Sequence, residues 1–433
     1  MRNRKDKLRA YIEEERLKQA KGIKEREQGL KTETDLINDA IGCRRSGKTS
    51  LMKLEMKRLQ EKFGQDSVYY INFENRRLYP LTSDYFNDLI QIIYEEGNDK
   101  CFLFLDEVQR VKNWEKYVRS IYDEFKGKIK IFISGSSSKL IKSKTSYLLS
   151  GRHLTTAVFP LNFREFMAFN NISFEKPFTE EKESKIVKAL KNYLSLGGFP
   201  ETVLTKNEEL IETLFLDIIN RDISPKVKNK EILEDAAYFL CSNSAKLVSF
   251  SKLVKLLKSR GIKISVPTLE RYFRLMKEAF LFFDFTIFSY KVKDQLQYPR
   301  KIYCIDNGFI NYFGFKFSED KGRIMENTVA INLYQLSLQH QKTNIFYFKS
   351  QRQEEVDFVI KEGTKIKQLI QVCYDTSNPD TKERETKALL KASEELKCND
   401  FLIISHDKEG EEKIKGEKIK YTPLWKWLLE NKK

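Results

Sequence analysis

The sequence predicts an α/β fold that begins with a parallel β-sheet covered by helices on both faces. Short apolar runs at 36–41, 67–73, 101–106 and 129–134 alternate with amphipathic helical patterns, as parallel strands joined by helices do. A glycine-rich loop follows the first run, and an acidic pair follows the third. Together these observations predict the sheet of a P-loop nucleotide-binding protein, which we place at residues 32–160.

The segment before this sheet, residues 1–31, predicts a charged helix. Its apolar positions Leu8, Ile12 and Leu17 are too sparse for a wide core-facing stripe. The first strand includes Asn38 and Asp39, which need hydrogen-bond partners if the strand is buried. We therefore expect this strand to be short.

The loop after the first strand has the pattern G-x-x-x-x-G-K-[ST]. The glycines let the backbone wrap around phosphate oxygens, and the N–H groups that open the next helix favour negative charge. Lys48 can reach the β- and γ-phosphates, and the Thr49 hydroxyl can ligate Mg²⁺. The predicted nucleotide-binding residues are Gly42, Cys43, Arg44, Arg45, Ser46, Gly47, Lys48, Thr49 and Ser50.

The third apolar run delivers Asp106 and Glu107 to the carboxyl edge of the sheet, where ligands bind in open α/β folds. Asp106 is predicted to hold Mg²⁺, and Glu107 to orient and deprotonate the attacking water. The alternative is an ordinary acidic pair at a strand end. The presence of Lys48 upstream favours the catalytic interpretation.

The fourth run leads into Ser134-Gly135-Ser136-Ser137-Ser138. A hydroxyl here is placed to bond the γ-phosphate or the attacking water, and we take Ser134 as the candidate, although serines are also common turn residues. Arg152 is a candidate arginine finger, because such a cation stabilises a transferring phosphoryl group. It fits a structural surface arginine equally well, and a finger acting in trans requires a homo-oligomer.

Three further segments complete the predicted organisation. Residues 161–229 predict a helical lid, which the turn at 197–200 punctuates with two glycines and a proline. Residues 230–310 predict a winged helix, with helices at 251–260 and from about 265, then strands at 280–290 and 301–305. Residues 311–433 predict a second α/β domain, with helices at 322–336 and 381–396 and strands at 344–348, 355–360, 367–374 and 401–405.

Composition excludes several classes of protein. The sequence contains no run of about 18 apolar residues, and its charged start lacks the apolar segment of a secretion signal. Its 6 cysteines lack C-x-x-C spacing and its 3 histidines lack metal-ligand spacing, which disfavours a disulfide framework, a zinc enzyme and a Ser-His-Asp hydrolase. We expect a cytoplasmic protein without a membrane partner.

The net charge of +16 indicates a polyanionic partner, unless it reflects only a lysine-rich proteome. Residues 224–301 hold 16 Lys/Arg against 7 Asp/Glu, so the excess is concentrated in the predicted winged helix. In such a domain the second helix enters a major groove and the wing touches phosphates. DNA is therefore the predicted partner, with the candidate contacts Arg271, Arg274, Lys277, Lys291 and Lys293, although the same residues fit a solvated face.

The chain resembles prokaryotic AAA-type ATPases that carry an ATPase core, a winged helix and a C-terminal domain similar to PD-(D/E)XK nucleases. The resemblance covers residues from about 35 to the C-terminus. It implies ATP as the nucleotide, and a sheet in which the strand before Ser134 lies between the P-loop strand and the Asp106 strand. The motifs that carry it are 42–49, 105–109, 134–137, 150–152, 159–166, 197–201 and 355–358.

The same resemblance implies a degenerate nuclease-like site. Such sites place acidic residues on a helix and a strand, here Glu326 and Asp357, then a Glu-x-Lys on the next strand. Here that element reads Gln371-Val372-Cys373, which lacks both the carboxylate and the ammonium. Lys365 and Lys367 precede the strand and are possible substitutes. We expect weak or absent cleavage, or else a local structural role for Glu326 and Asp357.

The leading hypothesis is an Mg²⁺-dependent ATPase that acts as a nucleotide-driven switch or motor on DNA. A second hypothesis is a nucleotide-gated binding module with little turnover. A third is a working ATP-dependent nuclease, which Gln371 and Cys373 argue against.

Overall fold

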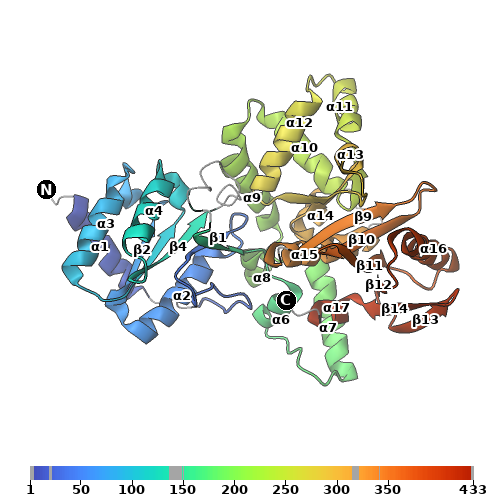
Figure 1. The fold of residues 1–433 in the computed structure, drawn as a ribbon, viewed down its shortest axis with the longest axis horizontal. Helices are drawn as coiled ribbons and strands as arrows, with labels where there is room; N and C mark the ends of the chain where they lie inside the picture. Colours follow the sequence, from blue (N-terminus) through green and yellow to red (C-terminus); the bar gives the residue numbers. More distant parts are fainter. Residues whose placement is uncertain are drawn as a thin grey trace. The chain divides into compact units, whose positions relative to one another are not determined.

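The computed structural model describes residues 4–18, 22–135, 149, 151–314, 321–340 and 342–430. The chain divides into two compact units, Met1–Phe159 and Pro160–Lys433. In Figure 1 the first unit runs from blue to blue-green and the second from green to red. None of the helices that the structure describes combines the length and the apolar character needed to cross a bilayer.

The first unit is built on a parallel five-stranded sheet. The strands are β1 (Ile37–Ile41), β2 (Val68–Asn72), β3 (Cys101–Asp106), β4 (Ile129–Gly135) and β5 (His153–Ala157), in the spatial order β2-β3-β4-β1-β5. The predicted parallel sheet is confirmed, with β4 between β1 and β3. The sequence analysis missed β5, a half-buried edge strand that contains two threonines and lacks an apolar run.

Helices cover both faces of this sheet, as Figure 1 shows. They are α2 (Lys48–Phe63), α3 (Asp84–Glu96) and α4 (Trp114–Glu124), with 3₁₀ turns at Gln65–Ser67, Arg76–Leu78 and Val108–Arg110. Because side chains alternate along a strand, Phe104 and Phe132 point to one face, where their stacked rings lie 4.4 Å apart against Met52 of α2. Phe73, just after β2, packs instead on Phe86 of α3.

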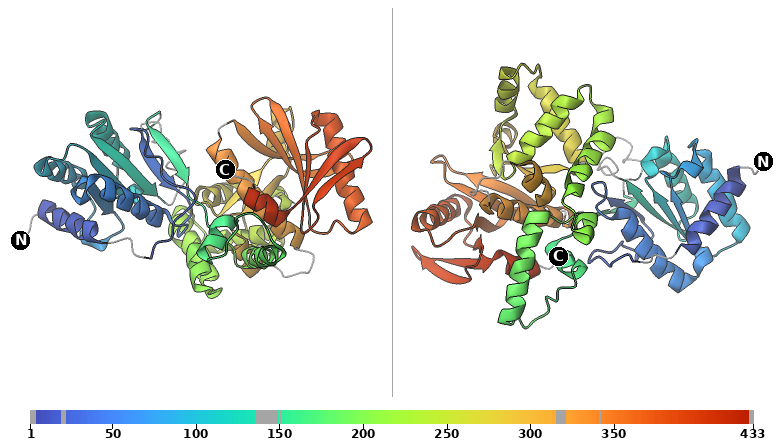
Figure 2. Two further views of the ribbon diagram at one scale, coloured as in Figure 1. Left: turned by 90° about the horizontal axis from the view of Figure 1, so that it is seen from below. Right: turned by 180° about the vertical axis from the view of Figure 1, so that it is seen from behind.

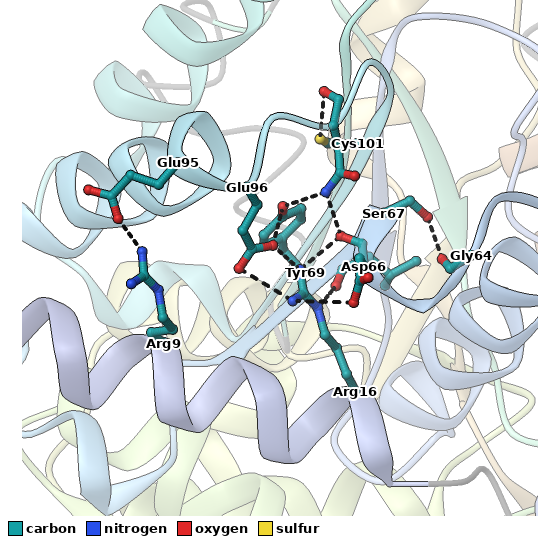
Figure 3. Close-up of polar contacts among 11 residues, drawn as sticks. Arg9, Arg16, Gly64, Asp66, Ser67, Tyr69, Glu95, Glu96 and Cys101 are labelled. Carbon is teal, nitrogen blue, oxygen red and sulfur yellow. Dashed lines mark hydrogen bonds and ion pairs between the residues drawn. The ribbon is translucent and has the colours of Figure 1, made fainter.

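The N-terminal helix α1 (Arg4–Leu17) is shorter than the predicted helix 1–31 and belongs to this unit. It buries Leu8, Tyr11 and Ile12. Arg16 is the polar anchor: its guanidinium lies 4.5 Å from the centre of the Tyr69 ring and 2.7 Å from the carboxylate of Glu96 (Figure 3). The sequence analysis underestimated this helix because an arginine and a tyrosine contribute to its buried face.

The two polar residues of β1 do find partners. The Asn38 amide donates to the Lys31 carbonyl at 2.5 Å. The buried Asp39 carboxylate accepts from the Thr155 hydroxyl at 2.7 Å and lies 3.0 Å from the His153 ring on β5. This contact raises the pKa of His153 above its ordinary value. The strand is short, as expected, and its polar side chains join it to β5.

The second unit opens with helices α6 (Phe163–Phe169), α7 (Glu180–Leu196), α8 (Pro200–Thr205) and α9 (Glu209–Asp217), followed by a π-helix (Ile218–Ile223) and a 3₁₀ turn (Ser224–Lys226). The turn between α7 and α8 packs directly on Asp306, whose carboxylate accepts the Gly198 N–H at 2.6 Å. A Cβ at Gly197 would lie 1.8 Å from an Asp306 oxygen, so this position requires glycine.

The central part of this unit contains α10 (Lys230–Ser242), β6 (Lys246–Val248), α11 (Phe250–Ser259), α12 (Val266–Glu278), β7 (Phe282–Phe285), α13 (Val292–Gln297) and β8 (Arg300–Cys304). The three strands form an antiparallel sheet in the order β6-β8-β7. The predicted helix start is confirmed, because the Ser265 hydroxyl caps α12. The predicted strand 280–290 is wrong in extent: β7 ends at Phe285, and α13 follows.

The C-terminal part begins with α14 (Asn307–Phe313) and α15 (Lys321–Gln339). A mixed sheet follows, in the order β13-β14-β12-β11-β10-β9, and its orange and red strands fan out in the left view of Figure 2. Its elements are β9 (Thr343–Lys349), β10 (Glu355–Glu362), β11 (Lys365–Cys373), α16 (Pro379–Leu396), β12 (Phe401–Ser405), β13 (Gly410–Ile414), β14 (Glu417–Pro423) and α17 (Leu424–Glu430). The sequence analysis missed the last three elements.

Candidate functional site

The glycine-rich loop turns tightly between β1 and α2. At Gly42 a Cβ would lie 2.0 Å from the Val158 carbonyl oxygen, so only glycine fits this turn. Gly47 precedes α2 and has no side chain to cap it, which leaves the first N–H groups of a 16-residue helix directed toward the loop. These N–H groups provide the anion-binding environment that the sequence predicts.

Lys48 and Ser46 face the inside of the loop. The buried Lys48 ammonium donates to the carbonyl oxygens of Gly42 at 3.0 Å and Cys43 at 2.8 Å. The buried Ser46 hydroxyl has no hydrogen-bond partner among the described residues. Since buried hydroxyls are normally paired, this orphaned group fits a site that receives an oxygen-rich ligand. The loop therefore suits a triphosphate.

The outer residues of the loop contact the neighbouring strand end. The Arg44 guanidinium lies 3.7 Å from the carboxylate of Glu74, which also pairs with Arg110. Arg45 has a positive φ of 60° and is exposed, and Ser50 is exposed in the first turn of α2. The sequence analysis missed Glu74. Its signal was an acidic residue just after β2, at the same sheet edge as Asp106.

Asp106 is the most buried acid of the site and accepts three hydroxyl groups. Thr49 and Tyr70 each donate to its Oδ2 at 2.8 Å, and Ser134 donates to its Oδ1. The P-loop and the acidic strand end thus meet, as predicted. Tyr70 was not among the predicted site residues. Its position two residues before the end of the buried strand β2 could have indicated that its hydroxyl lies near the site.

Two of these oxygen atoms have the spacing of a magnesium site. Mg²⁺ takes octahedral oxygen ligands at about 2.0–2.1 Å, so adjacent ligands lie about 2.9 Å apart. The Thr49 Oγ1 and Asp106 Oδ2 atoms are 2.8 Å apart. A hydroxyl and a carboxylate are also the ligand types that this ion prefers. The two residues therefore fit Mg²⁺.

Glu107 is held in an unusual backbone conformation beside Asp106. Its φ of 53° is left-handed, and its N–H donates to the Ser134 hydroxyl at 3.1 Å. The carboxylate accepts from the Gln109 amide at 2.5 Å. Burial raises the pKa of Glu107 above its ordinary value, while the positive charge of Lys48 acts in the opposite direction. A raised pKa suits a group that takes a proton near neutral pH.

The Ser134 hydroxyl donates to the Asp106 carboxylate and accepts the backbone N–H of Glu107. Contact between Ser134 and a γ-phosphate remains a prediction. The other serines of that segment, Ser136 to Ser138, lie outside the described residues, as does Ser150.

Arg152 lies at the opposite edge of the sheet from the P-loop. Its carbonyl accepts the Ile37 N–H at 2.8 Å, at the amino end of β1, whereas the loop follows the carboxyl end. At about 3.3 Å per residue, the length of β1 places the two about 16 Å apart. The Arg152 guanidinium instead bonds Asp123 of α4 at 3.0 Å. Arg152 of the same chain therefore lies far from the phosphate-binding loop, and the finger role remains a prediction that a second copy of the chain would have to fulfil.

The second predicted cluster, Glu326 and Asp357, does come together, but around a lysine. The buried Lys301 ammonium, from β8, lies 2.9 Å from Glu326, 2.8 Å from Glu355 and 2.7 Å from Asp357. Tyr303 also donates to Glu326, at 2.7 Å. Burial and the nearby Asp357 carboxylate raise the pKa of Glu326 to about 8.

Neither of the two lysines that the sequence offers as substitutes reaches this cluster. Lys367 pairs with Glu362 on the exposed edge of the hairpin, and Lys365 opens β11. Lys301 was missed because it lies about 25 to 55 residues upstream of these acids, in a segment assigned to another domain. Lys301 lies on β8 of the three-stranded sheet and Asp357 on β10 of the six-stranded sheet, so tertiary packing, not sequence spacing, brings them together.

The remnant positions Gln371 and Cys373 are used structurally. The side-chain carbonyl of Gln371 accepts the backbone N–H of Asp357 at 3.2 Å, and its side-chain NH₂ group donates to the Glu385 carboxylate. The Cys373 thiol donates to the Asp375 carbonyl at 3.2 Å, and burial raises its pKa to about 11. Within the described part of the chain, no group of three or more His, Cys, Asp or Glu side chains is arranged to hold a metal ion.

The predicted DNA contacts on α12 are not equivalent. Lys277 pairs with Asp284 of β7, and Arg271 donates to the Lys226 carbonyl at 2.7 Å. Arg274 is exposed on the same helix. The prediction that all three side chains are exposed on one face is therefore wrong for Lys277, which is half-buried beside the Asp284 carboxylate. Lys291 and Lys293 are both exposed.

Comparison with known proteins adds family matches. Residues 37–167 match the family model of an AAA domain, while residues 187–320 and 321–427 match two domains of unknown function. The chain is 36% identical over 427 residues to the Methanocaldococcus jannaschii protein MJ1544, covering 95% of this chain and 92% of that protein. It is 28% identical over 402 residues to a Haemophilus influenzae protein, covering 91% of this chain and 94% of that protein.

Among solved structures, the Walker-type ATPase PABY2304 of Pyrococcus abyssi is 14% identical, with a TM-score of 0.41. The match covers 72% of this chain and 96% of that one. The prediction of an AAA-type domain with a P-loop core is confirmed by the family match.

Proposed function

The chain belongs to the family of the Methanocaldococcus jannaschii protein MJ1544, and from the geometry of its AAA domain we propose that it hydrolyses the β–γ bond of ATP and uses nucleotide state as a switch on DNA. The observation that carries this proposal is the 2.8 Å contact between the Thr49 hydroxyl and the Asp106 carboxylate, with Glu107 next to it. It joins the phosphate-binding loop to the acidic strand end in one site.

Each residue has a distinct part in the proposed reaction. The loop amides and Lys48 bind the phosphate oxygens, and Thr49 and Asp106 hold Mg²⁺, which when bound neutralises charge on the β- and γ-phosphates. Glu107 orients the attacking water and takes its proton. Gln109 fixes the Glu107 carboxylate, and Ser134 fixes the backbone from which it projects.

The test of this proposal is ATP turnover by the full chain, with and without DNA. We expect Glu107→Gln to lower kcat by about 10²- to 10⁴-fold, the usual contribution of a general base, while ATP affinity stays within a few-fold. Glu61→Gln is the matched control, because Glu61 is an exposed glutamate on α2, outside the site. Turnover that Glu107→Gln leaves unchanged contradicts the proposal.

The central part of the second unit supports a DNA-binding role. Its order, helix-strand-helix-helix-strand-wing-strand, matches that of a winged helix, and residues 224–301 hold 16 Lys/Arg against 7 Asp/Glu. Arg274 on α12 and the exposed Lys291 and Lys293 are the proposed phosphate contacts.

We propose further that the C-terminal α/β part is a nuclease-like domain that does not cleave. Lys301 supports this proposal because its ammonium lies among the carboxylates that would otherwise bind a divalent cation. A metal ion would have to displace a buried positive charge that already has three carboxylate partners.

A further inference from the structure

The segment between β7 and β8 exposes more apolar surface than an ordered protein segment normally does. We call residues 289–298 the wing tip. Its Tyr290 is 80% exposed, Val292 68%, Leu296 71% and Tyr298 50%. Four large apolar side chains exposed within ten residues mark a candidate binding surface.

The exposure belongs to an ordered segment. The Ser289 hydroxyl donates to the Asp294 carboxylate at 2.7 Å, and the Gln295 amide donates to the Ser289 carbonyl at 2.8 Å. The Tyr298 N–H closes the turn onto the Asp294 carbonyl at 2.9 Å. These bonds fix α13 with its apolar side chains directed outward.

The root of the wing tip is fixed as well. Asp284 of β7 pairs with Lys277 of α12 and, at 2.9 Å, with Arg300 at the start of β8. The strands that carry the wing tip are therefore tied to α12. These ion pairs hold the wing tip and α12 in a fixed relation to each other, so one ligand can contact both.

The chemistry of the wing tip favours nucleic acid as the occupant. Its two tyrosines, Tyr290 and Tyr298, flank the exposed Lys291 and Lys293 in the sequence. The acid of the segment, Asp294, is turned toward Ser289. Protein interfaces are depleted in lysine, and two copies of this surface would repel each other. Bases that stack on tyrosines beside phosphates that contact lysines satisfy both features.

We infer that the wing tip stacks on unpaired bases, so that this chain binds DNA with a locally opened strand better than intact duplex. The inference rests on the DNA contact proposed above. Stacking of one base on an aromatic side chain typically changes affinity by about 10- to 100-fold. A wing that contacts only phosphates would bind both forms of DNA equally.

The experiment measures fluorescence anisotropy of the full chain with a labelled duplex and with the same duplex containing a central unpaired bubble. We expect the wild type to bind the bubble at least about tenfold more tightly than the duplex. Tyr290→Ala with Tyr298→Ala should remove this preference and leave duplex affinity nearly unchanged. Tyr290→Phe with Tyr298→Phe should keep it, because stacking needs the ring and not the hydroxyl.

The matched control is Tyr79→Ala with Tyr94→Ala, two tyrosines of the first unit that are 52% and 65% exposed. It should leave the preference intact. Equal affinity of the wild type for bubble and duplex overturns the inference but leaves the proposed DNA contact standing. A preference for the bubble that survives the alanine changes, or that is lost in the phenylalanine changes, has the same consequence. Conversion of a wild-type oligomer to monomer by the alanine changes, seen by sedimentation, also overturns the inference. Failure of the wild type to bind either DNA removes the proposed DNA contact as well.

Discussion

Replacing Lys301 by methionine tests whether the buried ammonium stabilises the C-terminal part. The side chain is 3% exposed and lies within 2.9 Å of carboxylate oxygens of Glu326, Glu355 and Asp357. Methionine fills a similar volume, so the change removes charge without leaving a large cavity. The carboxylates of Glu326, Glu355 and Asp357 then lose the positive charge that they share.

Breaking a buried ion pair by removing one partner typically costs about 3–5 kcal/mol. Two of the acids keep another donor: Tyr303 for Glu326, and the Val372 N–H for Asp357 at 2.9 Å. We therefore expect a loss near the lower end, about 3 kcal/mol at pH 8.

The loss should depend on pH in a direction that the structure fixes. The pKa of Glu326 is raised in the folded protein to about 8, and Lys301 lowers it, so the methionine variant should have a still higher value. Between the unfolded pKa near 4.5 and the folded value, the native state binds more protons than the unfolded state. Both proteins should therefore lose stability as pH rises through this window. The difference between them should grow as pH rises above about 8, where the wild type releases the Glu326 proton and the variant still keeps it.

The assay is urea unfolding followed by tryptophan fluorescence. Trp425 and Trp427 lie on α17 of the second unit, and Trp114 lies on α4 of the first, so a Trp114→Phe background makes the signal specific to the second unit. Lys367→Met is the matched control, because its exposed ion pair with Glu362 should contribute at most about 1 kcal/mol. Adding Asp357→Asn should recover part of the Lys301→Met loss. The reasoning is refuted if Lys301→Met and Lys367→Met lower the free energy of unfolding equally. It is also refuted if the effects of Lys301→Met and Asp357→Asn on that free energy simply add in the double variant.

Two further predictions concern the acids themselves. Gln109→Leu removes the hydrogen bond that lowers the pKa of Glu107, so the acidic limb of the ATPase pH profile should move to higher pH; an unmoved limb would show that Gln109 does not act on the base. Incubation of the wild type with supercoiled plasmid in Mg²⁺ or Mn²⁺ should leave the plasmid intact, and cleavage that Asp357→Ala abolishes would establish a working nuclease site instead.

The first sheet could be predicted because its signals are local. The glycine-rich motif identifies Lys48 and Thr49, and strand direction places them at the same sheet edge as Asp106 and Glu107. β5 could not be found in this way, because its half-buried pattern carries no apolar run. Tyr70 was hidden for another reason: its aromatic ring is a normal core residue, and only the fold brings its hydroxyl to Asp106.

The roles of arginine and lysine were the hardest to predict, because a long cationic side chain gives no signal of its partner. Arg16 is a core anchor, Arg152 pairs with a helix at the far edge of the sheet, and Lys277 offsets Asp284. In sequence, all three have the same appearance as the exposed Arg274. Charge counts therefore indicate only a kind of partner, which remains a proposal, while the choice of contacting residues depends on tertiary structure.

The two acidic sites differ in how their charge is balanced, and this difference explains why one is proposed to react and the other is not. Asp106 receives three hydroxyl donors, which stabilise the carboxylate by hydrogen bonding but leave its negative charge in place for a cation. Glu326, Glu355 and Asp357 share one ammonium, which lies between them and offsets one of their negative charges. Among the described residues, a divalent ion meets no bound cation at Asp106, whereas at the second site it has to compete with the buried Lys301 ammonium. The same reasoning predicts that a cation introduced beside Asp106 would disable nucleotide hydrolysis, as Lys301 is proposed to disable cleavage.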